Sequence, residues 1–375
     1  MKKRAEHQEP FVRMTKRASI TPGKAWMIRG IALLGAIVTG ALLLLILGHN
    51  PFGIYGEMVR GAFGGTMYIK ETVRTAVPLL ISAIGIAFAF KMKFWNIGAE
   101  GQILIGGIAA SAVAIHYDAQ FAAWAAESGS FLPRILMLVL MFLAAIVAGG
   151  LYGVVPAIFK SKWGTNETLF TLMLNYIALQ YVKYLAYQPA WKMAGTSFPK
   201  VRMFDPIAVL PKVMGIHIGW IIALVLVVVA HFYLTRTKHG YEIAVVGEST
   251  NTARYAGINV SKVYLRTMFI SGALCGLAGY LVVSGADGTL TEGTAGGVGF
   301  TAITVAWLSK MNPITMLIVA VFIAALDRGA GFQSSTGVPE SCAEVLVGII
   351  LFFMLGCEFF INYKLVFRGR KEAAA

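Results

Sequence analysis

Residues Ile31–Leu47 read IALLGAIVTGALLLLIL, an apolar run without a single charged side chain. An α-helix needs roughly 20 such residues to cross the hydrocarbon core of a bilayer. Similar runs recur along the chain at Ile135–Phe159, Ile218–Leu234, Met316–Leu326 and Val345–Ile361. Charged residues make up only 13% of the 375 positions and the mean hydropathy is +0.71, whereas soluble domains carry about 25% charged residues. The sequence therefore predicts an all-α, polytopic membrane protein.

We predict ten transmembrane segments, some of them short or broken. They lie at about 30–48, 77–90, 103–115, 134–159, 168–187, 216–235, 263–284, 299–309, 313–326 and 342–363. Two of them are separated at Lys310–Pro313, because a proline ends or restarts a helix and a lysine favours the inner face. Ten segments also place the basic C-terminal tail on the same side as the basic N-terminal tail. Residues 50–75 mix glycine, charge and aromatic side chains, and we expect them at the membrane interface.

The basic residues indicate which parts of the chain face the cytoplasm. The net charge is +14, from 32 basic and 18 acidic residues. The basic residues lie between apolar segments, so the positive-inside rule explains them without a nucleic-acid partner. We expect 1–29 and 364–375 to be cytoplasmic tails, 30–363 to be the transmembrane domain, and 236–262 to be a cytoplasmic loop. The predicted outer loop, 189–215, departs from the rule because it carries Lys192, Lys200, Arg202 and Lys212.

A polar, glycine-broken stretch, Phe94–Gln102 (FWNIGAEGQ), separates two of the apolar runs. Glu100 and Gln102 would be costly facing lipid, so we expect them to face protein or a water-filled path. Broken helices in membranes occur where they line such a cavity. Alternatively, Glu100 caps the backbone amides of the helix that begins near Gln102. The sequence leaves both interpretations open.

A second polar group, Asn166–Tyr176 (NETLFTLMLNY), opens and enters another predicted span. Asn166 is expected to cap the helix. Asn175 lies in the middle of the span, where it either forms an interhelical hydrogen bond or contacts a transported ligand.

The predicted cytoplasmic loop contains a short segment with helix caps at both ends, Val246–Ile258 (VGESTNTARYAGI). Ser249 or Thr250 can start a helix, and Gly257 can stop it. A short capped helix with small faces, one aromatic and one charge suits docking into a groove of a partner, although an ordinary connecting loop is the simpler alternative.

Glycine pairs at helical spacing occur in two of the predicted spans. Gly149 and Gly153 form one pair, and Gly272 and Gly276 form the other. Such pairs let two transmembrane helices approach closely, so we interpret them as packing positions.

The sequence has no arrangement that supports chemistry within this chain. It lacks a GxxxxGK[ST] phosphate loop, so the chain cannot hydrolyse nucleotide by that route. The six histidines are dispersed, and the three cysteines have no paired spacing. We therefore expect a transport subunit with no catalytic residue, metal or cofactor of its own. An ion-driven carrier acting alone would need charged pairs in mid-membrane, and the sequence offers few of them.

Several of these stretches together resemble one family. The stretch Phe94–Gln102 is similar to the NIGAEGQ signature of bacterial ABC-importer permeases for branched-chain amino acids, ribose and nucleosides, and Ala253–Ile258 resembles their coupling segment. Gly299–Leu308 with Asn312–Ile314 resembles their late block. The stretches Asn166–Thr168 and Met173–Ile177 are closer to the nucleoside branch. The resemblance covers about residues 75–365 and implies a permease similar to those of type II ABC importers, in a bacterial inner membrane.

The resemblance also implies partners. A second permease chain, often a paralogue, would complete the path, two cytoplasmic ATPase subunits would use ATP to drive it, and an extracytoplasmic lipoprotein would deliver the substrate. The expected substrate is a nucleoside, and the alternatives are a simple sugar in the same machinery or an ion-coupled carrier. Departures from the family pattern at Gly247–Thr250, and at Trp307 followed by Ser309–Lys310, bear on partner identity.

Two sets of functional residues are expected on this basis. The coupling residues are Gly247, Glu248, Asn251, Ala253, Arg254, Tyr255, Ala256 and Gly257. The path of a neutral ligand should have aromatic walls and a few amides, for which the candidates are Trp95, Asn96, Glu100, Gln102, Asn175 and Phe300.

Overall fold

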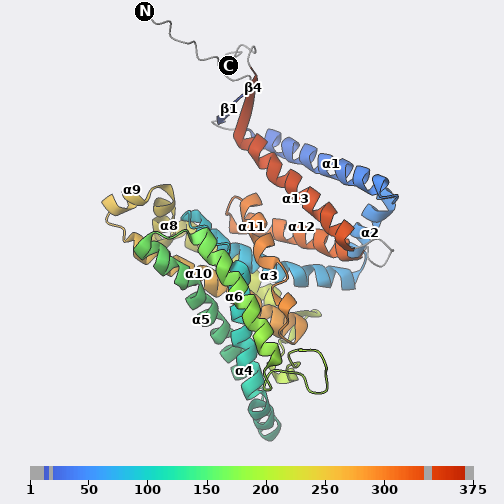
Figure 1. Ribbon diagram of the computed structural model, residues 1–375, viewed down its shortest axis with the longest axis vertical. Coiled ribbons are helices and arrows are strands. Elements are labelled where there is room, and N and C mark those ends of the chain that lie inside the picture. The colour runs from blue at the N-terminus through green and yellow to red at the C-terminus, as the bar shows by residue number, and fades with distance from the viewer. Residues whose placement is uncertain (1–11, 17–19, 333–339, 368–375) are drawn as a thin grey trace, which may run out of the picture. The chain divides into compact units, whose positions relative to one another are not determined.

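The computed structural model describes residues 12–16, 20–332 and 340–367, and their regular structure is almost entirely α-helical (Figure 1). Chain contacts divide the protein into two compact units, Val59–Gly329 and the combination of Met1–Met58 with Ala330–Ala375. The α-helices are α1 (Pro22–Ile46), α2 (Pro51–Phe63), α3 (Thr66–Lys91), α4 (Ala99–Ser128), α5 (Leu132–Trp163), α6 (Glu167–Tyr187), α7 (Gly219–Arg236), α8 (Lys238–Glu248), α9 (Thr250–Tyr255), α10 (Val260–Tyr280), α11 (Val298–Leu308), α12 (Pro313–Phe332) and α13 (Glu340–Asn362). The short elements are β1 (Val12–Lys16), η1 (Pro206–Ala208), β2 (Lys212–Val213), β3 (Ile216–His217), η2 (Leu281–Asp287), η3 (Glu292–Thr294) and β4 (Tyr363–Phe367).

Each of the ten predicted segments coincides with one of these helices. Among the described residues, eight helices are long and apolar enough to cross a membrane. The other two predicted segments are α6, which is more polar, and α11, which has 11 residues. At 1.5 Å per residue α11 is about 16 Å long, so it cannot cross a 30 Å hydrocarbon core by itself.

The predicted break near Lys310 is confirmed. α11 ends at Leu308 and α12 begins at Pro313. Between them Lys310 and Met311 adopt positive φ angles of 50° and 56°, and the Asn312 side chain accepts a hydrogen bond from the Ile314 amide (3.1 Å). This turn therefore ends one helix and caps the next.

Helical structure extends beyond several predicted bounds. α1 begins at Pro22 and not at residue 30, because a proline fits the first turn, where its missing N–H is not needed. Residues 50–75 form α2 and the start of α3. The predicted cytoplasmic loop, 236–262, consists mostly of α8 and α9. The predicted C-terminal tail, 364–375, begins within β4, which pairs antiparallel with β1.

In the unit formed by the two ends of the chain, α1 packs against α13. Its core contains Leu44, Ile54, Met58, Ala330 and Leu346. An ion pair joins α1 to α13, with Arg29 Nη2 2.6 Å from Glu358 Oε1.

In the unit Val59–Gly329, α10 packs against α3, α4 and α5. The two predicted glycine pairs meet at the crossing of α5 and α10. A Cβ atom added at Gly149 would lie 2.7 Å from the Gly276 Cα, and one added at Gly153 would lie 2.6 Å from the Met268 carbonyl oxygen. The packing interpretation of these glycines is confirmed, because any side chain here would push the two backbones apart.

The basic loop between α6 and α7, which was predicted to lie outside, is held by an ion pair and by hydrogen bonds to the backbone. Arg202 Nη1 lies 2.8 Å from Asp118 Oδ2 in the second half of α4, and Arg202 Nη2 donates to the Ile115 carbonyl (2.6 Å). A buried partner therefore compensates one of the four basic charges of this loop. β2 and β3 form a hairpin whose two turn residues, Met214 and Gly215, have positive φ, as two-residue hairpin turns require.

His217 makes stability depend on pH at this hairpin. Its ring is buried, and Nδ1 accepts a hydrogen bond from the Gly219 amide (3.3 Å), which requires a neutral imidazole. Burial, with a smaller contribution from the Arg74 charge, lowers the pKa of His217 from 6.5 to about 4. The unfolded chain therefore takes up this proton first as the pH falls.

We expect the titration of His217 to lower the free energy of unfolding by on the order of 3 kcal/mol between pH 6.5 and pH 4. Below pH 4 this histidine is protonated in both states and should add no further pH dependence. Thermal unfolding of wild type and His217→Gln should be followed at pH 7.5 and pH 4.5. The substitution should flatten the pH dependence, whatever it does to stability at neutral pH. If the unfolding midpoint of His217→Gln changes between pH 7.5 and pH 4.5 as much as that of wild type, the pH dependence belongs to other groups.

Candidate functional site

The segment between α3 and α4 is fixed by the side chain of Asn96. Its Oδ1 accepts hydrogen bonds from the Gly98 amide (3.0 Å) and from Gln102 Nε2 (3.2 Å). Its Nδ2 donates to Gln102 Oε1 (3.1 Å) and to Ser271 Oγ on α10 (3.1 Å). All three side chains are buried. The amides of Asn96 and Gln102 therefore satisfy each other and position the turn against α10.

Asn175 holds the same segment from the side of α6. Its Oδ1 accepts from the Gly101 amide (2.8 Å), and its Nδ2 donates to the Ile97 carbonyl (2.9 Å). One helical turn earlier, Thr171 Oγ1 accepts from the Ile97 amide (3.2 Å). Of the two interpretations of Asn175, the structure shows the interhelical hydrogen bond.

Glu100 caps the start of α11 and not its own helix. Its two carboxylate oxygens accept hydrogen bonds from the amides of Gly297 and Gly299 at the start of α11, both at 2.7 Å. Gly299 permits this approach, because a Cβ atom there would lie 2.7 Å from the Glu100 Cα. Of the two interpretations left open for Glu100, helix capping therefore holds for α11 and not for α4: α11 brings its unpaired amides directly to the carboxylate, which lies in the first turn of α4.

Replacing this carboxylate by an amide should loosen α11. We expect Glu100→Gln to destabilise the folded chain by about 1–2 kcal/mol, since hydrogen bonds to a charged group contribute more than those to a neutral one. The matched control is Glu292→Gln, because Glu292 forms an exposed pair with Lys183 (3.5 Å), and exposed pairs contribute little. Thermal unfolding of both variants in detergent checks this. Equal midpoints would mean that the Glu100 charge does not hold α11.

Aromatic side chains gather at the C-terminal end of α11. The rings of Trp95 and Trp307 stack with centroids 5.6 Å apart and planes inclined by 18°. Phe90 packs edge-on against both rings. The two indoles remain 41% and 45% exposed. Trp307 was not among the predicted path residues, because its pairing with Trp95 across more than 200 positions leaves no local signal.

The six path residues predicted from the sequence thus separate into two kinds. Asn96, Glu100, Gln102 and Asn175 are hydrogen-bonded within the chain, whereas Trp95 and Phe300 are exposed. Within the described ranges, no group of three or more His, Cys, Asp or Glu residues is arranged to hold a metal ion.

The short helix expected in the cytoplasmic loop is present as α9. Ser249 Oγ accepts from the Thr252 amide (3.3 Å) at its start, and Gly257 follows its end with φ +76°. Ala253 is buried, while Tyr255 is 93% exposed. Gly247 at the end of α8 lies directly against the Lys91 carbonyl at the end of α3. The remaining predicted coupling residues, Glu248, Asn251, Arg254 and Ala256, are all at least partly accessible around α9.

Comparisons with known proteins agree with this architecture. The family model described as "branched-chain amino acid transport system / permease component" matches residues 68–355. The chain is 31% identical over 330 residues to a guanosine ABC transporter permease protein of Bacillus subtilis, covering 86% of this chain and 91% of the relative. It is 30% identical over 357 residues to a glucose ABC transporter permease protein of Haloferax volcanii, covering 91% of this chain and 90% of the relative.

A third relative is a nucleoside ABC transporter permease protein of Lactococcus lactis, 29% identical over 346 residues and covering 89% of this chain and 92% of its own. The match of the family model extends from the third residue of α3 into α13, and so includes the Asn96 turn, α9 and the α10 crossing. The chain is a multi-pass membrane protein that belongs to the family of ABC transporter permease components.

Proposed function

We propose that this permease subunit translocates a nucleoside into the cytoplasm. The observation that carries the choice of substrate is the exposed stacked pair, Trp95 and Trp307. Stacking of a nucleobase on an aromatic side chain contributes about 1–3 kcal/mol per base. The similarity to guanosine and nucleoside permeases supports the same choice. The similarity to a glucose permease makes a simple sugar the second candidate.

The proposed wall of the path is the exposed face of α11. Phe300, Thr304 and Trp307 lie at positions i, i+4 and i+7, which share one side of a helix. Trp95 extends this face at one end. Aromatic rings can take the flat face of a base, and the Thr304 hydroxyl can hydrogen-bond a ribose. Asn96, Gln102 and Asn175 position the segment that carries Trp95.

We further propose that partner subunits supply the energy. Two cytoplasmic ATPase subunits would dock on α9, through the exposed Tyr255 and its neighbours, and a second permease chain would complete the path. An extracytoplasmic binding lipoprotein would deliver the ligand. In this arrangement residues 1–29 and 364–375 lie in the cytoplasm. The cap at each end of α9 supports its role as a rigid docking element.

Reconstitution tests this function. The permease pair, the ATPase subunits and the binding protein should be placed in liposomes, and uptake of a radiolabelled nucleoside measured with and without ATP. Uptake should require ATP, and unlabelled nucleosides should compete while ribose, galactose and glucose do not. Competition by sugars alone would support the second candidate. Uptake by the permease without the ATPase would contradict the ABC mechanism.

Trp307→Ala should weaken nucleoside uptake more than it affects folding. We expect kcat/KM for uptake to fall about tenfold, because the indole that faces the ligand is lost and Trp95 loses its stacking partner. Trp307→Phe should recover part of the activity. The matched control is Trp124→Ala, since Trp124 is also 40% exposed but lies near the far end of α4. Equal loss in both alanine variants would rule out a specific role for Trp307.

A further inference from the structure

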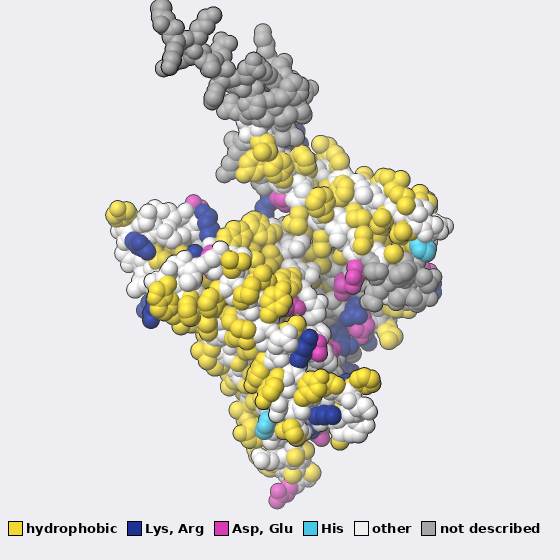
Figure 2. Space-filling view, in the orientation of Figure 1, with side chains coloured by type: hydrophobic (Ala, Val, Ile, Leu, Met, Phe, Trp, Pro, Cys, Tyr) yellow, Lys and Arg dark blue, Asp and Glu magenta, His cyan; other side chains and the backbone are white. Residues whose placement is uncertain are grey.

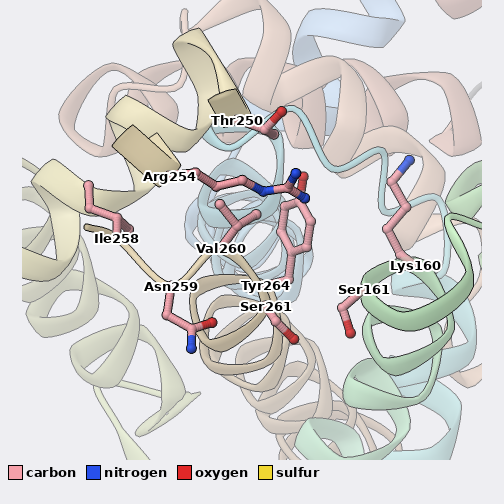
Figure 3. Close-up of a pocket in the computed structure, with 9 residues that line it drawn as sticks. All are labelled: Lys160, Ser161, Thr250, Arg254, Ile258, Asn259, Val260, Ser261 and Tyr264. Carbon is pink, nitrogen blue, oxygen red and sulfur yellow. The ribbon is translucent and has the colours of Figure 1, made fainter. Parts of the chain in front are cut away.

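A polar cavity lies beside α9. Its volume is about 540 Å³, and it is lined by the end of α5, by α9 and by the start of α10. Figure 3 shows that the Arg254 side chain extends across it towards Tyr264, with Ser261 and Ser161 below and Thr250 above. Tyr255, the next residue, is almost fully exposed. Consecutive helical residues point about 100° apart, so Arg254 faces the cavity while Tyr255 remains available for docking.

The cavity carries an excess of positive charge and of hydrogen-bond donors. Lys160 Nζ lies 2.6 Å from Glu167 Oε2, so these two charges compensate each other. Arg254 forms no ion pair with any described residue. The hydroxyls of Thr250, Ser261 and Tyr264 also form no hydrogen bond with any residue that the structure describes. One uncompensated guanidinium and three hydroxyls therefore line one space that is large enough for a small polar group.

Residues typical of a membrane interface lie beside the cavity. Trp163, at the end of α5, is 65% exposed, and Lys162 Nζ lies 5.8 Å from its ring centroid. Exposed tryptophan beside lysine is typical of the headgroup region. The apolar side chains of Leu169, Met173 and Ile177 are exposed along α6, which begins beside the cavity. Figure 2 shows hydrophobic side chains covering this side of α5 and α6. An acyl chain can lie on that surface while its headgroup enters the cavity.

We infer that this cavity binds a phosphate group, that of an anionic phospholipid of the cytoplasmic leaflet or free phosphate. Arg254 provides a bidentate donor that fits two phosphate oxygens, and the hydroxyls complete the shell. Basic pockets between transmembrane helices at the cytoplasmic side are suited to lipid headgroups. A phosphate held here bridges α9 to α5 and α10, so its binding stiffens the docking helix. The site is independent of the transported ligand.

The experiment uses the full chain in nanodiscs. In one arm, discs contain phosphatidylcholine with or without phosphatidylglycerol, and lipid retained on the ejected protein is counted by native mass spectrometry. In the other arm, inorganic phosphate is titrated calorimetrically into phosphatidylcholine discs. We expect retention of at least one phosphatidylglycerol per chain if the ligand is a lipid. Saturable phosphate binding without such retention is expected if the ligand is free phosphate.

Two variants target the cavity in different ways. Lys160→Gln with Arg254→Gln removes both cations, and Ser261→Asp adds a negative charge while keeping them. Aspartate in the first turn of α10 favours the helix, so Ser261→Asp should fold normally. Both should lower binding at least fivefold. The control, Lys93→Gln with Arg236→Gln, removes two exposed charges that do not line the cavity and should change binding less than twofold.

Equal binding by wild type and by folded Ser261→Asp in both arms would overturn the inference. Equal loss in the control pair would also overturn it, because the effect would then be general surface charge. Unchanged binding of lipid and phosphate together with weaker ATPase association in the double variant of Lys160 and Arg254 would assign the cavity to the ATPase instead.

Discussion

Replacing Gly276 with leucine should prevent the chain from reaching its folded state. Gly276 on α10 lies between two other helices: its hypothetical Cβ would meet the Ala145 carbonyl and lie 3.1 Å from the Gly149 Cα on α5. On α4, a Cβ added at Gly106 would meet the backbone of Gly276. Extra methylenes in a packed core cost about 1–3 kcal/mol even where side chains can shift. The backbone atoms on both sides of Gly276 cannot shift in this way. The cost of the leucine side chain therefore approaches the whole free energy of unfolding, which is about 5–15 kcal/mol for a folded protein.

Size-exclusion chromatography of a fluorescent fusion checks this result. Gly276→Leu should give aggregate without a monodisperse peak, while Gly276→Ala should fold with a much lower thermal midpoint. The control is Gly348→Leu on α13, where nothing lies within 4 Å of the added Cβ. It makes the same chemical change in a transmembrane helix and should leave the profile unchanged. A normal peak from Gly276→Leu would show that the crossing can separate without loss of the fold.

Gly257→Val should abolish transport while leaving the chain folded and inserted. Gly257 has φ +76°, and its amide donates to the Arg254 carbonyl (3.0 Å) while the Ile258 amide donates to the Ala253 carbonyl (2.9 Å). These bonds close the end of α9. A β-branched residue is strongly disfavoured at this φ, so the final turn should open and the proposed docking surface should lose its shape. We expect ATP-dependent uptake to fall at least tenfold.

The informative comparison is Gly257→Asn, because asparagine tolerates positive φ. It should retain most of the uptake, whereas the valine variant should not. The amount of folded protein in the membrane should be the same for both. If both variants lose uptake equally, the backbone angle is not what matters at this position. If neither does, α9 is not the coupling element.

The sequence predicted those features that depend on neighbouring residues. Apolar runs of sufficient length located eight of the ten predicted segments, all except α6 and α11, because burial in lipid requires a continuous apolar stretch. Ser249 and Gly257 identified the ends of α9, because caps act on the adjacent turn. The glycine pair on α5 and that on α10 indicated close packing, although not that they pack against each other.

Features that depend on distant residues could not be predicted in the same way. Whether Glu100 caps a helix or lines a path depends on its neighbours in space. Gly297, whose amide it accepts from, is nearly 200 residues away in the sequence. Asn175 showed the same ambiguity, since an amide in a span suits a neighbouring helix and a ligand equally well. The stacking of Trp307 on Trp95 also joins two segments that no periodicity connects. The sequence therefore identified these polar side chains, but only the tertiary contacts show which groups they bond within the chain.

The pairing of β1 with β4 has a consequence for biogenesis. Translation proceeds at roughly 5–20 residues per second, and domains fold as units in the order in which they emerge. β1 and α1 are made before the unit Val59–Gly329, whereas their partners β4 and α13 are made after it. α2 can pack on α1 as soon as it emerges, because Leu44 shares a core with Ile54 and Met58. The contacts of β1 with β4 and of α1 with α13 must wait until the whole of Val59–Gly329 has been translated, so the unit that contains them is the later of the two to mature.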